Sequence, residues 1–161
     1  MIPFAQATET FLTKLVGHAL ESISGVPDDD LNGWRPALGL EDINTFYALM
    51  THLLSAGEYW ILHAAAGRPA DRNRPAEFRA TGERMALIER ADTWITDTQA
   101  YLETLSEEDL IRVYERGGSE PLRWTVAECI VHAVEHTAVH VGHLQLQRQI
   151  WNAEHRASPS S

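Results

Sequence analysis

Apolar residues recur along the chain at the three- and four-residue spacing that is typical of amphipathic helices. The first such stretch covers residues 4–23 and predicts a helix with one buried face. We expect that face to consist of Phe4, Ala7, Phe11, Leu15, His18, Ala19 and Ser22. Gly25 and Pro27 come next, so the helix is expected to end there, and a connecting loop is expected to begin at the acidic residues 28–30.

Three further stretches show the same helical spacing. Residues 41–66 predict a second helix, with Glu41 and Asp42 in the first turn, where the helix dipole favours acids. Its expected core positions are Phe46, Leu49, Leu53, Tyr59, Trp60 and Leu62. Residues 76–105 predict a third helix, whose expected core positions are Phe78, Met85, Ile88, Ala91, Ile95, Thr98 and Leu102. A fourth helix is expected to run to about Glu154 and to begin at Thr125, which forms a capping box with Glu128.

The region between the third and fourth helices predicts little regular structure. Ser106 is a plausible N-cap for one short turn of helix at 106–109, residues 112–115 could be extended, and Gly117 and Gly118 interrupt the chain. β-Branched residues do not alternate over any long run, so strands are expected to be nearly absent. The pattern therefore predicts an all-α, up-down four-helix bundle over residues 1–155, with a short extra turn between helices 3 and 4 and a flexible tail at 156–161.

Composition narrows the classes of function. The chain has 161 residues, which fits one domain, and a formal net charge of −10, which argues against binding to nucleic acid or to an anionic membrane surface. No apolar segment is long enough to span a bilayer, and the N-terminus does not resemble a signal peptide. Cys129 is the single cysteine, so no intrachain disulfide can form. We expect a cytoplasmic protein.

Histidines cluster on one face of the predicted last helix. Relative to His132, the residues His136, His140 and His143 lie at about 40°, 80° and 20° around the helix axis, on a face that also carries Cys129. His132 and His140 are about 12 Å apart along the axis, too far to share one ion. Three pairs could share one: His132/His136, His136/His140 and His140/His143. The second of these is an H-x-x-x-H pair, whose imidazoles lie on adjacent turns.

A catalytic metal site needs about three protein ligands, so a third must come from another helix. His52, on the apolar face of the predicted second helix, is the best candidate. His63 lies too far along that helix to join it, and His18 is a weaker candidate. An isolated histidine is more often a core or surface residue than a ligand, whereas several inward histidines on one helix are costly without a metal or charge. A nucleophilic Cys129 is disfavoured because burial raises a thiol pKa.

The arrangement of these motifs resembles the DinB-like superfamily, which includes the YfiT-type metal-dependent hydrolases. The resemblance rests on His52 within Met-Thr-His-Leu-Leu and on the capped segment 124–144, and it covers about residues 1–155. It implies that His52, His136 and His140 are the metal ligands. The family often has Gln at the position of His143, and His143 instead resembles its thiol-dependent branch. His132, Glu135 and His143 are then expected to orient the ligands or to contact substrate.

The resemblance implies a divalent metal ion, with zinc or nickel favoured and iron or copper also suited to imidazole ligands. It implies a small-molecule substrate, with a low-molecular-weight thiol as one class, and a metal-dependent S-transferase or hydrolase activity. The alternative is a non-catalytic, stress-associated helical bundle with a structural metal or none. A homodimer is expected, because bundles of this size often pair through one helix.

Overall fold

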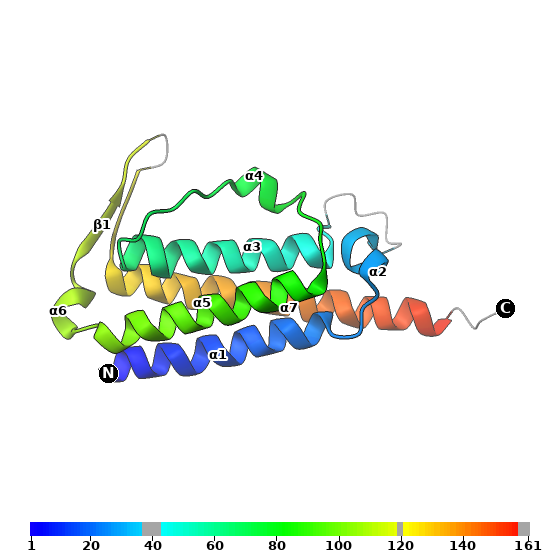
Figure 1. Ribbon diagram of the computed structural model, residues 1–161, viewed down its shortest axis with the longest axis horizontal. Coiled ribbons are helices and arrows are strands. Elements are labelled where there is room, and N and C mark those ends of the chain that lie inside the picture. Colours follow the sequence, from blue (N-terminus) through cyan, green and yellow to red (C-terminus); the bar gives the residue numbers. More distant parts are fainter. Residues whose placement is uncertain (37–42, 119–120, 158–161) are drawn as a thin grey trace.

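A computed structural model describes residues 1–36, 43–118 and 121–157. Its four long helical segments are α1 (Pro3–Ile23), α3 (Phe46–Glu58), α5 (Arg84–Thr104) and α7 (Val126–Ala157). A π-helix, η1 (Tyr59–Ala65), continues α3 without a break. Shorter elements are α2 (Asp28–Gly33), α4 (Arg74–Glu77), α6 (Glu107–Leu110), β1 (Val113–Arg116) and β2 (Leu122–Thr125). The expected all-α bundle is confirmed, with the addition of one small hairpin (Figure 1).

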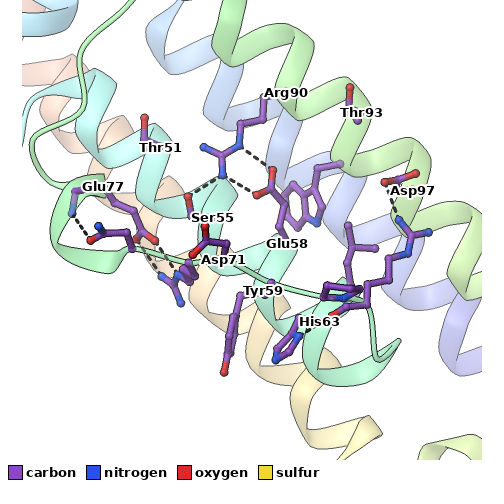
Figure 2. Close-up of a pocket in the computed structure, with 18 of the residues that line it drawn as sticks. Thr51, Ser55, Glu58, Tyr59, His63, Asp71, Glu77, Arg90, Thr93 and Asp97 are labelled. Carbon is purple, nitrogen blue, oxygen red and sulfur yellow. Dashed lines mark hydrogen bonds and ion pairs between the residues drawn. The ribbon is translucent and has the colours of Figure 1, made fainter.

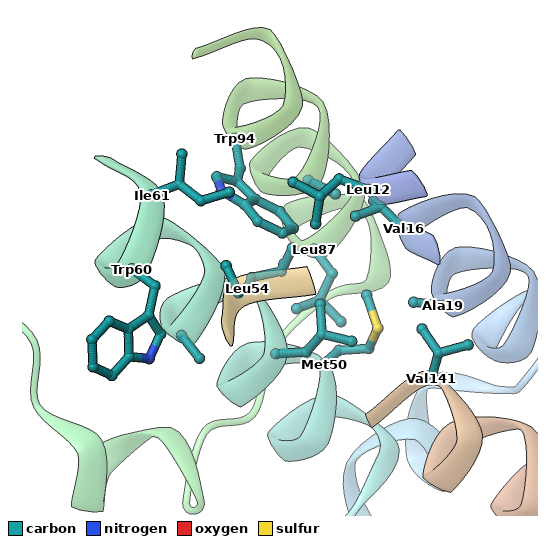
Figure 3. Close-up of a cluster of buried hydrophobic side chains, with 14 of the residues drawn as sticks. Leu12, Val16, Ala19, Met50, Leu54, Trp60, Ile61, Leu87, Trp94 and Val141 are labelled. Atoms are coloured by element: carbon teal, nitrogen blue, oxygen red, sulfur yellow. The ribbon is translucent and has the colours of Figure 1, made fainter. Parts of the chain in front are cut away.

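The long helices pack around one shared core. Both α1 and α3 pack against α5 and α7, so α1 and α3 occupy opposite corners of the bundle. The core brings together Leu12 of α1, Met50 and Leu54 of α3, and Trp94 of α5 (Figure 3). Burying each such side chain contributes about 1.5–3 kcal/mol, and this burial positions the two helices that carry the histidines.

The helix directions run up, down, down, up rather than alternating (Figure 1). Contacts near the start, middle and end of α3 and η1 show that α5 runs parallel to them: Tyr47 meets Gly82, Gly57 meets Trp94, and Arg68 just after η1 pairs with Asp97. Parallel neighbours need a connection that returns along the length of the helix. Residues 66–83, which include α4, make this return and arch over α3. We call residues 66–83 the strap.

The strap replaces the beginning of the predicted third helix, and this corrects the expectation of one helix over 76–105. Pro75 fits within the first turn of α4, where no intrahelical amide donor is needed, but α4 ends at Glu77. Gly82 then packs so closely on Tyr47 that a Cβ would lie 2.4 Å from the tyrosine oxygen. The continuous helix resumes only at Arg84.

Other local expectations also change. The acidic residues 28–30 open the short helix α2 rather than a loop, because acids are favoured in a first turn. The extended segment at 113–116 pairs with β2, which the sequence did not predict, in an antiparallel register that puts Tyr114 opposite Trp124. The second helix begins at Phe46, capped by Thr45, so the expectation that residues 43–45 are helical is wrong. Its predicted first residues, 41 and 42, lie outside the described residues, and it ends with η1. Helix α7 extends to Ala157, and the rest of the predicted tail, 158–161, also lies outside them.

The predicted buried face of α1 is shifted by one residue. The residues of α1 that are buried are Ala5, Thr8, Leu12, Val16, Ala19, Ser22 and Ile23. Phe11 is 57% exposed and, on α5, Met85 is 56% exposed. Two neighbouring apolar stripes compete on these helices, and the packing against other helices selects between them.

The predicted capping box at the start of the last helix is confirmed. The Glu128 carboxylate accepts hydrogen bonds from the backbone N–H of Thr125 (2.7 Å) and from its hydroxyl (2.7 Å). The Thr125 hydroxyl oxygen in turn accepts from the backbone N–H of Glu128 (3.2 Å). None of the helices in the described ranges is long and apolar enough to cross a membrane.

Candidate metal centre

Three histidines from two helices converge inside the bundle. His52 lies on α3, and His136 and His140 lie on successive turns of α7. One ligand nitrogen from each ring lies within 4.8 Å of the others. The ring centroids are 5.0 Å apart for His52 and His136, 4.8 Å for His52 and His140, and 4.4 Å for His136 and His140. Of the three pairs that helix geometry left open, the structure therefore brings His136/His140 together with His52.

Burial keeps these imidazoles neutral. Desolvation is the largest influence on all three, and it lowers the pKa of His136 to about 3 and that of His140 to about 4, with neighbouring histidines adding to the effect. The pKa of His52, which is only 3% exposed, is also lowered by burial, although Glu77 opposes the shift. Neutral imidazole is the form that binds metal ions. The site is thus in its ligand form at neutral pH.

Glu77 fixes the orientation of His52. Its Oε2 lies 2.7 Å from Nδ1 of His52, and it also accepts two hydrogen bonds from Arg72, at 2.7 Å to Oε1 and 3.0 Å to Oε2. Burial would raise the pKa of Glu77, but the hydrogen bonds from Arg72 and His52 outweigh it, and the net pKa is lowered. An ionised carboxylate can only accept, so Nδ1 of His52 carries the proton and Nε2 keeps its lone pair.

Sequence reasoning missed Glu77 and Arg72. Both lie on the strap, and no helical spacing relates them to His52, which is 25 residues from Glu77. The pairing is a carboxylate–histidine arrangement of the kind that fixes the tautomer of metal ligands. The burial of an acidic side chain in this connection would have pointed to the contact with His52, but burial cannot be read from the sequence.

The other predicted site residues lie next to this group rather than within it. The His132 ring packs against Trp60 and Trp124, with centroids 4.8 and 5.0 Å away, and its Nδ1 pairs with Glu135 at 3.2 Å. Glu135 therefore supports His132 and not the three converging rings. The exposed His143 ring is centred 5.4 Å from that of His140.

One cavity opens beside His140 and another beside Glu77. The first, of about 350 Å³, has His140 and His143 in its wall together with Leu49, Leu146 and Gln147. The other, of about 590 Å³, lies between α3, the strap and α5, and Glu77 forms part of its wall. Figure 2 shows this second cavity, in which Arg90 donates hydrogen bonds to Ser55 and Glu58.

Comparison with known proteins identifies the family. The family model for the DinB superfamily matches residues 12–144 of the sequence. The chain belongs to the DinB superfamily. A solved structure of a conserved protein from Enterococcus faecalis has the same fold, with a TM-score of 0.70, 17% sequence identity, and coverage of 93% of this chain and 98% of that one. No curated protein matches the sequence.

The residues of this DinB protein fit a metal ion. The Nδ1 atoms of His136 and His140 are buried and have no hydrogen-bond partner within the described part of the chain. Buried polar atoms are normally satisfied by protein, water or an ion. Three neutral imidazoles form a donor set that zinc, nickel, copper and iron all accept. The group could therefore hold a divalent cation, and three protein ligands leave coordination positions free for water or substrate.

Proposed function

We propose that this DinB protein is a metal-dependent enzyme that holds a divalent cation through His52, His136 and His140. The observation that carries the proposal is the convergence of three neutral imidazoles within 4.8 Å, one of them backed by a buried carboxylate. Histidines that only fill the core have no reason to bring three ring nitrogens to one point. Zinc and nickel are the favoured ions, and iron and copper would also suit these ligands.

The chemistry that such a cation would supply is the activation of a water or a thiol at neutral pH. The chain's own contribution is to hold the ligands in place. Glu77 keeps the proton of His52 on Nδ1, so that Nε2 is free, and the strap and α5 shield this side of α3. Activation of a thiol favours an S-transferase and activation of water favours a hydrolase, the two classes that the family resemblance implies.

A small-molecule substrate would enter through the 350 Å³ cavity beside His140. Leu49 and Leu146 offer apolar contacts there, and Gln147 and His143 offer polar ones. His143 is the residue that we propose takes up the proton released by the attacking thiol or water, because it lies one turn after His140 in the same cavity wall. A low-molecular-weight thiol is the co-substrate that fits this reaction.

Metal content tests the site. We expect purified protein loaded with zinc to retain about one ion per chain by elemental analysis and His136→Ala to lose it, because removing one of three ligands leaves too few. His155→Ala is the matched control, since His155 is on the same helix but stacks on Trp151 at its far end. Equal zinc in wild type and His136→Ala would refute the three-histidine site.

A second experiment separates an enzyme from a structural metal protein. Within the described residues the group has three members, and neither His132 nor His143 joins it as a fourth ligand. An open position should therefore remain. We expect the visible spectrum of the cobalt(II)-substituted protein to change when β-mercaptoethanol is added, as a thiolate enters the coordination sphere. An unchanged spectrum would favour the alternative, a non-catalytic bundle with a closed structural site. The expected homodimer stays a prediction, which light scattering of the purified protein would test.

A further inference from the structure

The strap is a long connection in which no apolar side chain is fully buried. It spans residues 66–83, all of which the structure describes, and Glu77 is the one residue of this segment that is buried. Glu77 is 5% exposed, whereas its neighbours Ala76 and Arg79 face solvent. A connection of this length is normally held down by apolar side chains. In this strap the buried side chain is instead a charged one, that of Glu77.

The contacts of the strap are arranged around His52. At its end, Gly82 exchanges two hydrogen bonds of 2.9 Å with the side chain of Asn32. Near its start, Arg68 pairs with Asp97 at 2.8 Å, in a contact exposed to solvent. Between these two contacts, Glu77 bonds Nδ1 of His52 and Phe78 packs on the His52 ring with centroids 4.6 Å apart. The guanidinium of Arg72 also lies over the ring of Tyr59.

The ion pair between Glu77 and Arg72 needs the imidazole of His52 to hold it against the bundle. Arg72 neutralises Glu77, but both residues belong to the strap, so this ion pair by itself does not hold Glu77 against α3. The bond from Nδ1 of His52 is the contact that connects the carboxylate of the pair to the bundle, whereas the Arg72 guanidinium lies over the ring of Tyr59 on η1, 5.5 Å from its centroid. A cation on the opposite nitrogen of an imidazole draws electrons from the ring and makes its N–H a stronger donor, and the carboxylate in return makes the ring a stronger ligand.

We infer that Glu77 is a positioning residue that couples metal binding at the three histidines to docking of the strap over the 590 Å³ cavity. This inference rests on the proposed metal site. Coupling of this kind is reciprocal: the factor by which the docked strap tightens metal binding equals the factor by which metal binding stabilises the docked strap. Residues that hydrogen-bond to metal ligands typically change metal affinity by about 10–100-fold. Metal binding should therefore raise the equilibrium constant for docking of the strap by the same factor. Access to the cavity under the strap then depends on metal loading.

Hydrogen–deuterium exchange and zinc affinity test the coupling. Exchange is followed by mass spectrometry in peptides from residues 68–80, with and without zinc, and affinity is measured by competition with a chelator. In the wild type we expect zinc to slow exchange in these peptides by about 10–100-fold. In Glu77→Gln, which keeps the shape but loses the charge, we expect zinc to bind about 10–100-fold more weakly and to leave strap exchange nearly unchanged.

Glu58→Gln is the matched control. Glu58 lines the same cavity and pairs with an arginine, Arg90, but it does not touch His52. It should leave both zinc affinity and the zinc effect on the strap at wild-type values. Arg72→Gln provides a second test if Glu77→Gln does not fold, and we expect it to weaken zinc binding in the same direction.

The outcomes are distinct. Failure of the wild type to bind zinc refutes the metal site and the coupling together. Zinc binding that leaves strap exchange unchanged refutes the coupling alone, as does a Glu77→Gln variant that behaves like Glu58→Gln.

Discussion

Gly57 sets how closely α3 can approach α5. A Cβ built at this position would lie 2.1 Å from Cζ2 and 2.4 Å from Cη2 of Trp94, whose side chain is 1% exposed. These distances are more than 1 Å inside normal contact, and the indole is enclosed by the core, so it cannot rotate away. We therefore predict that Gly57→Ala destabilises the protein, although alanine favours helix.

The magnitude follows from two opposing contributions. Replacing glycine by alanine inside a helix contributes about 1 kcal/mol of stability. Overpacking a close-packed core costs about 1–3 kcal/mol, and an overlap with a rigid ring belongs at the upper end or above. We expect a net loss of about 2 kcal/mol in the free energy of unfolding.

Gly17 on α1 provides the control for this prediction. It is exposed, and nothing lies within 4 Å of a Cβ built there. Gly17→Ala should therefore show the helix contribution alone and stabilise the protein by about 0.5–1 kcal/mol. Urea denaturation followed by circular dichroism measures both variants, with an unchanged slope indicating that stability alone has changed. Stabilisation by Gly57→Ala, or the same sign for both variants, would refute the packing argument.

Three other predictions follow from the helices and the histidines. Burial lowers the pKa of His136 to about 3 and that of His140 to about 4, so protons compete with zinc for these ligands only in acid. Zinc affinity, measured by chelator titration, should therefore change little from pH 7 to about pH 5. A steep fall in affinity already above about pH 6 would contradict this. Leu12→Ala should cost about 2–5 kcal/mol in urea denaturation and Phe11→Ala less than about 1, since only Leu12 is buried; equal losses would contradict the register. Thr125→Ala should cost about 1 kcal/mol by the same assay, and no loss would mean that the capping box is not stabilising.

Much of the fold was predictable because it depends on interactions within single helices. The capping box at Thr125 and Glu128, the spacing of His136 and His140, and the existence of four long helical segments all follow from local backbone geometry. The bundle class follows in turn, because amphipathic helices must bury their apolar faces against one another. The choice of His52 as the third converging histidine needed only its position on an apolar face of another helix.

Other features were beyond local patterns. The buried face of α1 shifted by one residue because α5 and α7 select between two adjacent apolar stripes. Strand β2 forms because β1 lies beside it; its alternation of apolar and polar residues covers only four positions, too few to predict a strand without the partner. The parallel course of α3 and α5 required a returning segment, and this broke the predicted third helix into α4 and α5.

The amino-acid sequence alone thus determined that four long helical segments form, that Thr125 and Glu128 cap the last one, and which histidines share a face, since residues three or four apart meet in any helix of this chain. The tertiary structure alone decided that Glu77, carried by the strap and paired with Arg72, reaches His52. The physical reason is that this contact depends on how a long connection crosses the bundle, and neither helical period nor side-chain propensity encodes that path.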